Sequence, residues 1–177
     1  MNLLQSEIEE RIEIAISLYE LHKNTFSYYK IMDALDDVDE EFLFEYMYSG
    51  YQEIFADIDE NVEAYINKMI REELDTTLRT KDTSNKRAII IAETDTNAIA
   101  NYKRNKEMIL QGYTRKRWDT MKDNLVRHSH VMADGQEVAI TEAFTVGGSK
   151  MYYPMDSSLG AGADEIVNCR CVCKYFR

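Results

Sequence analysis

Asn168-Cys169-Arg170-Cys171-Val172-Cys173 is the stretch from which the organisation of this chain can be read. It contains all three cysteines, and a second short stretch, Arg127-His128-Ser129-His130, contains two of the three histidines. Both stretches lie in the part of the chain that begins at Gly112, which holds six of the seven glycines. Because glycine marks turns, we expect a turn-rich module after Gly112 and helices before it.

Apolar residues recur at helical spacing before Gly112, which predicts a series of helices. Ser6 and Glu9 form a capping box for the first helix, and Asp59 is a good N-cap for a later one. Gly112 stands where a C-cap glycine would end a long helix. We predict helices at about 6–23, from about 42 with an interruption at 49–50, after 59 and at about 86–110, with a separate Tyr-rich segment at 26–35.

The residues after Gly112 favour short strands and tight turns. Asp134-Gly135 is a strong hairpin signal, and Pro154, the only proline, ends one of the expected strands. We predict strands at 113–120, 138–140, 151–153 and 169–176. The fold class is therefore α+β, with a long-helix N-terminal region, 1–83, followed by a small β-containing C-terminal module, 84–177.

The net charge of −11 is unevenly distributed. Residues 1–80 contain 20 Asp and Glu against 6 Lys and Arg, whereas residues 81–177 contain 12 against 15. An acidic half repels nucleic acid and suits a basic protein surface, although a merely solvated face has the same composition. No apolar run is long enough to span a membrane, and no secretory signal is recognisable, so we expect a bacterial cytosol or an assembly made there.

The histidines and cysteines suggest a metal site. If 168–174 is a strand, its cysteines share one face, and if 127–131 is extended, His128 and His130 do so too. Two imidazoles and two thiolates are ligands that Zn²⁺ prefers, which makes His128, His130, Cys169 and Cys171 the candidate set. The alternative is that the cysteines are small buried hydrophobic residues and the histidines are simply hydrogen-bonded.

Two catalytic alternatives use the same residues. Cys169 and His130 could form a nucleophile–base pair. A small ribonuclease could use His128 or His130 with Arg127 and Lys122 for acid–base chemistry and phosphate binding. The C-x-C spacing disfavours a disulfide, and the chain has no P-loop and no H-E-x-x-H motif.

An ordered set of residues in the second half of the chain resembles the phage Mu F-like minor head proteins, also called phage head morphogenesis proteins. The resemblance covers about residues 84–174. Within it, 87–96 resembles the family's R-A-x-x-I-A-R-T-E-T stretch, with Glu93 in place of Arg and Asp95 in place of Glu. The other residues that carry it are Gly112, Trp118, Thr120, Asp123, Val126, Arg127, His130, Asp134, Gly135, Gln136, Phe144, Tyr153, Pro154, Asp156, Glu165, Asn168, Cys169, Arg170 and Cys171.

The chain departs from the family pattern at two places. Many relatives carry C-x-x-C before the Asp-Gly turn, where this chain has Arg127 and His130. Many also carry His-Pro before the N-C-R-C element, where this chain has Ile166-Val167. These departures remove residues that would be expected as zinc ligands.

The resemblance implies a structural protein and not an enzyme. Such proteins are minor components of tailed-phage or prophage heads that associate with the portal and capsid proteins and act in head assembly, with some linked to DNA packaging or ejection. It implies location in the virion, and in the host cytoplasm during assembly, with no membrane and no small-molecule substrate. Region 1–83 would then dock on the portal or capsid, and Arg115, Lys116 and Arg117 are the candidate DNA contacts. The alternative functions are a small His-dependent nuclease or toxin-like enzyme and a nucleic-acid-binding module.

Overall fold

The computed structural model describes residues 3–55 and 58–177, and for residues 3–8 only the helical backbone. The chain divides into two compact units, Met1–Thr96 and Asn97–Arg177. This division falls inside a helix, whereas the boundary expected from the sequence, 83/84, lies in the turn before that helix. None of the helices in the described part of the chain is long and apolar enough to cross a membrane.

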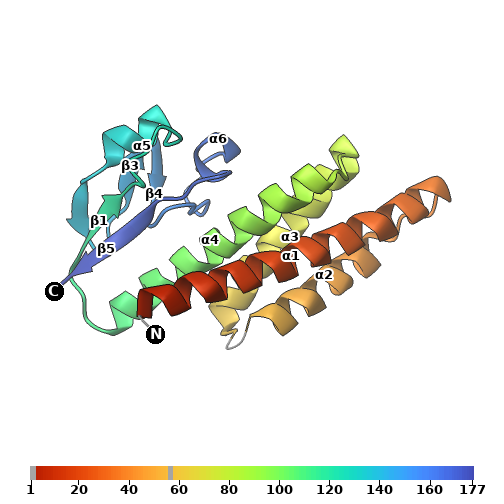
Figure 1. The fold of residues 1–177 in the computed structure, drawn as a ribbon, viewed down its shortest axis with the longest axis horizontal. Coiled ribbons are helices and arrows are strands. Elements are labelled where there is room, and N and C mark those ends of the chain that lie inside the picture. The colour runs from red at the N-terminus through yellow and green to blue at the C-terminus, as the bar shows by residue number, and fades with distance from the viewer. Residues whose placement is uncertain (1–2, 56–57) are drawn as a thin grey trace. The chain divides into compact units, whose positions relative to one another are not determined.

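The first unit is made of helices that pack side by side (Figure 1). They are α1 (Leu3–Ala34), α2 (Glu40–Ile54), α3 (Glu60–Thr80) and the first half of α4 (Asn85–Leu110). Consecutive helices contact one another, α1 with α2 and α2 with α3. The prediction of an α-helical N-terminal part is therefore confirmed.

Two predicted interruptions of these helices are wrong. α1 continues without a break through 24–26, because no glycine or proline stands there to end it. Thr25 Oγ1 donates to the Leu21 carbonyl at 2.9 Å within the helix. α2 likewise runs through Gly50. A Cβ at Gly50 would lie 2.7 Å from Leu21 Cδ2 and closer still to Cδ1, so glycine there permits the close approach of α2 to α1.

The helix ends follow local sequence signals. Asp59 caps α3, since its carboxylate accepts from the Asn61 and Val62 backbone N–H groups at 2.9 Å, as predicted. Gly112 has φ +77° and donates to the Ile109 carbonyl at 3.0 Å, which is the C-cap geometry predicted for α4. The helix α1 already begins at Leu3, before the predicted cap at Ser6, whose side chain lies outside the described part of the chain.

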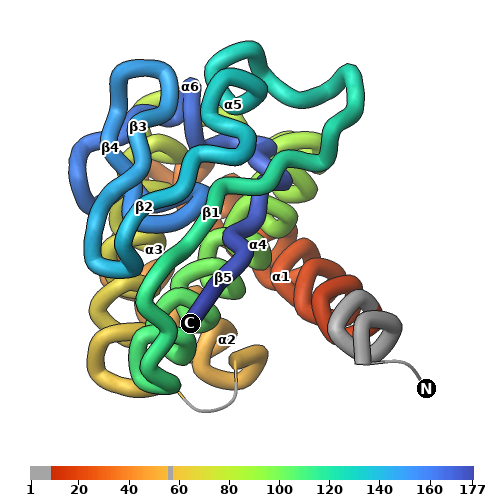
Figure 2. Tube along the Cα trace, turned by 90° about the vertical axis from the view of Figure 1, so that its left-hand side faces the viewer, coloured from red at the N-terminus to blue at the C-terminus, as the bar shows by residue number. Residues whose placement is uncertain are grey.

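The second unit contains the rest of α4, a three-stranded antiparallel sheet and a separate hairpin. In the sheet, β1 lies between β2 and β5 (Figure 2). The elements that follow α4 are β1 (Arg115–Asp119), α5 (His128–Ala133), β2 (Glu137–Ala139), β3 (Phe144–Val146), β4 (Ser149–Met151), α6 (Ala163–Ile166) and β5 (Val172–Phe176).

The core of this unit is built around Trp118 on β1, which is fully buried. Its ring lies edge-on to His130 on α5, at 5.5 Å between centroids, and to Phe144 on β3, at 5.4 Å. From α4, Asn101 donates to the Pro154 and Cys171 carbonyls at 3.3 and 3.4 Å. These contacts tie helix, sheet and hairpin of the second unit together.

Three local predictions for this unit are wrong. Residues 128–133 form the short helix α5 and are not extended, and Cys169 and Cys171 precede β5 instead of lying in it. The Asp134-Gly135 turn joins α5 to β2 and does not connect two adjacent strands. Its Gly135 has φ +80° and donates to the Trp118 carbonyl at 2.9 Å, so the turn closes onto β1.

Candidate functional site

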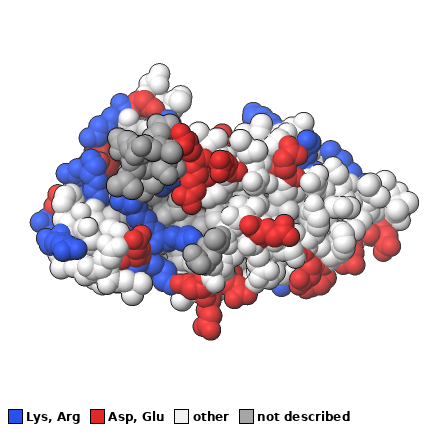
Figure 3. All heavy atoms as spheres, turned by 60° about the horizontal axis from the view of Figure 1, so that its bottom comes forward, with Lys and Arg blue, Asp and Glu red and all other residues white. Residues whose placement is uncertain are grey.

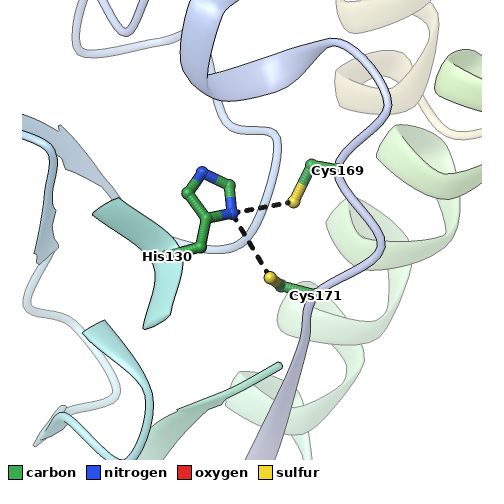
Figure 4. A group of neighbouring side chains, drawn as sticks. All are labelled: His130, Cys169 and Cys171. Atoms are coloured by element: carbon green, nitrogen blue, oxygen red, sulfur yellow. Dashed lines mark hydrogen bonds between the residues drawn. The ribbon is translucent and has the colours of Figure 1, made fainter. Parts of the chain in front are cut away.

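His130, Cys169 and Cys171 meet in the interior of the second unit (Figure 4). His130 Nδ1 lies 3.3 Å from Cys171 Sγ and 3.6 Å from Cys169 Sγ. The three side chains are 1, 2 and 4% exposed for His130, Cys169 and Cys171, and their ligand atoms all lie within 4.8 Å of one another. The structure therefore brings together three of the four residues predicted as metal ligands.

His128, the fourth predicted ligand, is not part of this group. It is exposed at the start of α5, whereas His130 is buried. Residues two apart point to one side of a strand but are separated by roughly 200° around a helix. The helical conformation of 128–133 is thus the physical reason why only one imidazole faces the cysteines.

The segment between α6 and β5 turns the sulfurs inward by its backbone conformation. Asn168 has φ +60°, and the Cys169 N–H donates to the Ile166 carbonyl at 3.0 Å. Arg170, between the two cysteines, points outward and donates to both carboxylate oxygens of Asp123 at 2.9 Å. Because Arg170 points outward, its neighbours Cys169 and Cys171 both point to the inner side.

Glu165 on α6 completes the surroundings of the imidazole. Its Oε2 lies 2.9 Å from His130 Nε2 and accepts from Ser129 Oγ at 2.8 Å. The carboxylate holds a proton on Nε2, so Nδ1 faces the sulfurs as a donor when the ring is protonated and as a free lone pair when it is neutral. Glu165 belongs to the ordered family pattern in the sequence, but neither it nor Ser129 was predicted as a site residue.

The cluster changes the acidity of its members. A hydrogen bond from Cys171, with help from His130, lowers the pKa of the Cys169 thiol to about 5, although burial opposes this. The same contact, together with burial, raises the pKa of Cys171. Burial would lower the pKa of His130, but the Cys169 sulfur and the Glu165 charge outweigh it and raise that pKa. At neutral pH the thiolate is therefore the favoured form of Cys169, and the thiol is the favoured form of Cys171.

Two kinds of chemistry use a thiolate, an imidazole and a second thiol: metal binding and nucleophilic catalysis. A catalytic cysteine must be reached by its substrate, and Cys169 is 2% exposed. In addition, both sulfurs face the same imidazole nitrogen, which a nucleophile–base pair does not require. The geometry favours metal binding.

A second buried polar cluster lies in the first unit and was not predicted. His22 on α1 has Nδ1 3.2 Å from Glu73 Oε1 on α3, and Nε2 3.6 Å from Asp95 Oδ2 on α4. Tyr51 on α2 lies 3.2 Å from the same Nε2 and also donates to Asp95. Burial lowers the pKa of His22, but the two carboxylates raise it to about 10 in total, so each helix contributes one member to a charged core.

The candidate DNA contacts are separated by the strand. Arg115 and Arg117 lie on one side of β1, where Arg115 pairs with Glu137, and Arg117 pairs with Asp119 at 3.1 Å. Lys116 faces the other side, is fully buried and donates to the Tyr152 carbonyl at 2.6 Å. The triplet therefore does not form a continuous basic surface.

Comparison with known proteins gives one match. Residues 56–174, more than half of the chain, match the family described as Phage Mu protein F like protein. The chain belongs to this family. It is a Mu F-like phage head morphogenesis protein, which confirms the resemblance seen in the sequence. No match was found among curated proteins or among solved structures.

The family match begins at residue 56, earlier than the expected residue 84, and ends inside β5. The residues that carried the resemblance hold the second unit together. Asp134 Oδ1 accepts from Thr120 N and Oγ1 at 2.8 and 2.9 Å, and Arg127 donates to the Val167 carbonyl. The Asp134 bonds link the turn after α5 to the end of β1. Arg127 and the Asp123–Arg170 pair link the segment before α5 to the segment before β5.

Proposed function

We propose that the protein is a non-enzymatic minor head protein of a tailed phage or prophage, carried in the virion, that docks on the portal through its helical unit during head assembly. Membership of the Phage Mu protein F like family supports the role in head morphogenesis. The observation that carries the docking is an unusual surface on α1 and α2, which we call the α1–α2 patch: Tyr28, Ile31, Leu35, Phe42 and Tyr46.

The large apolar side chains of the α1–α2 patch are exposed to solvent. Ile31 and Leu35 are 60 and 72% exposed, and Tyr28 and Phe42 about 40%. The Tyr28 ring lies edge-on to Phe42 and Tyr46, with centroids 5.5 and 5.0 Å apart, so the three aromatic side chains form one cluster. Exposed aromatic clusters are typical of the centres of protein interfaces.

Exposed acidic residues stand next to the patch residues in the sequence. On the right-hand part of Figure 3, where the helices of the first unit lie, Asp and Glu side chains are interspersed with uncharged surface, and Lys and Arg side chains lie along the upper edge. A partner with an apolar centre and a Lys- and Arg-rich rim would complement this arrangement in charge and in burial. We assign that partner role to the portal. The exposed acidic residues next to the patch in sequence are Asp36, Asp37, Asp39, Glu40, Glu41 and Glu45.

Co-purification with the portal protein and quantification in purified heads test the proposal. The double variant Tyr28→Ser, Phe42→Ser should weaken portal binding by about tenfold or more, since central aromatic residues each contribute on the order of 1–2 kcal/mol or more to an interface. Ile12→Ser, which changes an apolar residue of α1 that is 53% exposed and outside the patch, is the matched control. Equal binding by both variants would remove the patch from the interface, and absence of the protein from heads would overturn the function.

The enzyme alternative makes the opposite prediction. A His-dependent nuclease would cleave RNA or DNA, and His128→Ala or His130→Ala would abolish the cleavage. The proposed structural role predicts no turnover by the wild-type protein, under conditions in which it still binds the portal. Reproducible cleavage that His128→Ala removes would replace the structural role by the catalytic one.

A further inference from the structure

We propose that His130, Cys169 and Cys171 bind one zinc ion through Nδ1 and the two sulfurs, and that the fourth ligand position faces solvent. The inference does not rest on the docking function. It starts from the convergence of three donor atoms that an apolar core would not need to bring together. All three side chains are at least 96% buried, and each has the other two as neighbours.

The spacing of the donors is the spacing that zinc imposes. With Zn–N at about 2.0–2.1 Å and Zn–S at about 2.3 Å in a tetrahedron, the nitrogen and each sulfur are separated by about 3.6 Å. The measured separations from His130 Nδ1 are 3.3 Å to Cys171 Sγ and 3.6 Å to Cys169 Sγ. An ion can therefore be accommodated with only small movements of the side chains.

The surroundings hold the imidazole as metal sites usually do. A histidine ligand normally donates its second N–H to a carboxylate or carbonyl, which fixes the tautomer and the ring orientation. Glu165 occupies this place at 2.9 Å from His130 Nε2, and Ser129 in turn holds Glu165. Glu165 is thus a positioning residue and not a ligand, because it lies on the side of the ring that faces away from the sulfurs.

The charges also balance. Two thiolates and one neutral imidazole around Zn²⁺ give a site without net charge, which a buried position tolerates better than an isolated thiolate. The buried Trp118 indole N–H faces the Cys171 sulfur and has no other hydrogen-bond partner in the described part of the chain. A metal-bound thiolate would be a better acceptor for this N–H than a thiol.

The fourth position is open. Among the described residues the group of mutually close ligand atoms has three members, and a small hollow adjoins it. The hollow is lined by the three ligands together with Leu125, Arg127 and Arg170. Water or a small anion can enter there, and Arg127 stands beside the hollow, whereas the charge of Arg170 is already paired with Asp123. The ion would connect α5 to the segment before β5 and so fasten two parts of the chain about 40 residues apart.

Elemental analysis of the full chain, purified with reductant and without chelator, tests the assignment. We expect one zinc per chain in the wild type and in two matched controls, His128→Ala and Cys173→Ser, which change the other histidine of α5 and the third cysteine. Cys169→Ser and Cys171→Ser should each retain less than about a tenth of an equivalent. Wild-type protein with no more zinc than these two variants, or equal loss in Cys173→Ser, would overturn the proposal.

Glu165→Gln and cobalt substitution keep the test valid if the cysteine variants fail to fold. Glu165→Gln should retain the ion but bind it about 10- to 100-fold more weakly in competition with a chelating dye. Cobalt-substituted wild type should show thiolate-to-cobalt charge-transfer bands and the visible bands of tetrahedral Co²⁺, and azide should shift the visible bands. Undiminished affinity in Glu165→Gln would reject its positioning role, octahedral-type cobalt spectra would reject the thiolate site, and insensitivity to azide would reject the open position.

Discussion

His22 Nδ1 and Glu73 Oε1 lie 3.2 Å apart in the interior of the first unit, with side chains that are 0 and 9% exposed. Asp95 faces the other ring nitrogen, and Arg87 lies close enough to Glu73 to favour its charged form. The imidazole is therefore held between two carboxylates from two other helices. Such a pair contributes to stability only while the imidazole keeps its proton.

Raising the pH should weaken the first unit through His22. Its pKa is about 10 in the folded chain and about 6.5 when unfolded, so its contribution is fully present below pH 6.5 and is lost as the pH rises toward 10. Burial also raises the pKa of Glu73, whose own contribution begins to be lost already as the pH rises above 4.5. Urea unfolding monitored by circular dichroism from pH 6.5 to 10 should show a falling free energy of unfolding, and His22→Gln should flatten this fall. A slope that is unchanged in the variant would contradict the assignment.

Breaking the same cluster at neutral pH should be costly. Glu73→Ala leaves a buried imidazolium with Asp95 as its single carboxylate partner, and removal of one partner of a buried ion pair costs about 3–5 kcal/mol. Thermal and urea unfolding at pH 7 measure the loss. The control is Glu72→Ala, which removes the neighbouring, exposed carboxylate of α3 and should cost less than about 1 kcal/mol.

Gly50 and Leu21 should show strong energetic coupling. Gly50→Ala gains about 1 kcal/mol of helix propensity but drives its methyl group into the Leu21 side chain, so we expect a net loss of about 1–3 kcal/mol. In a Leu21→Ala background, which removes the obstructing methyl groups, the same substitution should become stabilising. A double-mutant cycle of unfolding free energies measures this change of sign. Stabilisation by Gly50→Ala in the wild-type background would show that α1 and α2 can move apart at little cost.

Lys116→Met should preserve or increase the stability of the second unit. Burial lowers the pKa of Lys116 to about 8, so the folded chain disfavours its charged form at neutral pH. Methionine removes this cost but leaves the Tyr152 carbonyl without its donor, and we expect a change within about 1 kcal/mol of wild type or a gain. As the pH rises from 8 to 10.5 the wild type should recover relative to the variant. A loss above about 2 kcal/mol at pH 7 would mean that the bond to Tyr152 dominates.

The features that the sequence predicted are those with a local cause. Asp59 caps its helix through two bonds to residues within three positions, and Gly112 ends α4 because glycine adopts the required positive φ. The α+β architecture follows in the same way, because apolar residues recur at helical spacing before residue 112 and strand and turn signals replace them after it. The predicted break in α1 has no such local cause: Lys23 and Asn24 are exposed, and polar residues on the exposed side of a helix do not interrupt it.

The candidate site was predictable in its donors but not in its geometry. A helix of six residues such as α5 has little intrinsic stability and is held by tertiary contacts, among them the one from His130 to Glu165, 35 residues away. For the same reason no local sequence pattern could show that His128 lies away from the cysteines. The His22 cluster was even harder to predict from the sequence, because its members are single polar residues on four different helices.

The central strand of the second unit also sets an order of events during synthesis. β1 pairs with β5 across 53 to 61 residues, whereas the helices of the first unit contact their immediate successors. Contacts between distant residues form slowly, so the bundle can mature while β1 still has one unpaired edge. Until β5 emerges from the ribosome, that edge is open to strands from other nascent chains, and crowding by newly made head proteins would make this interval prone to aggregation.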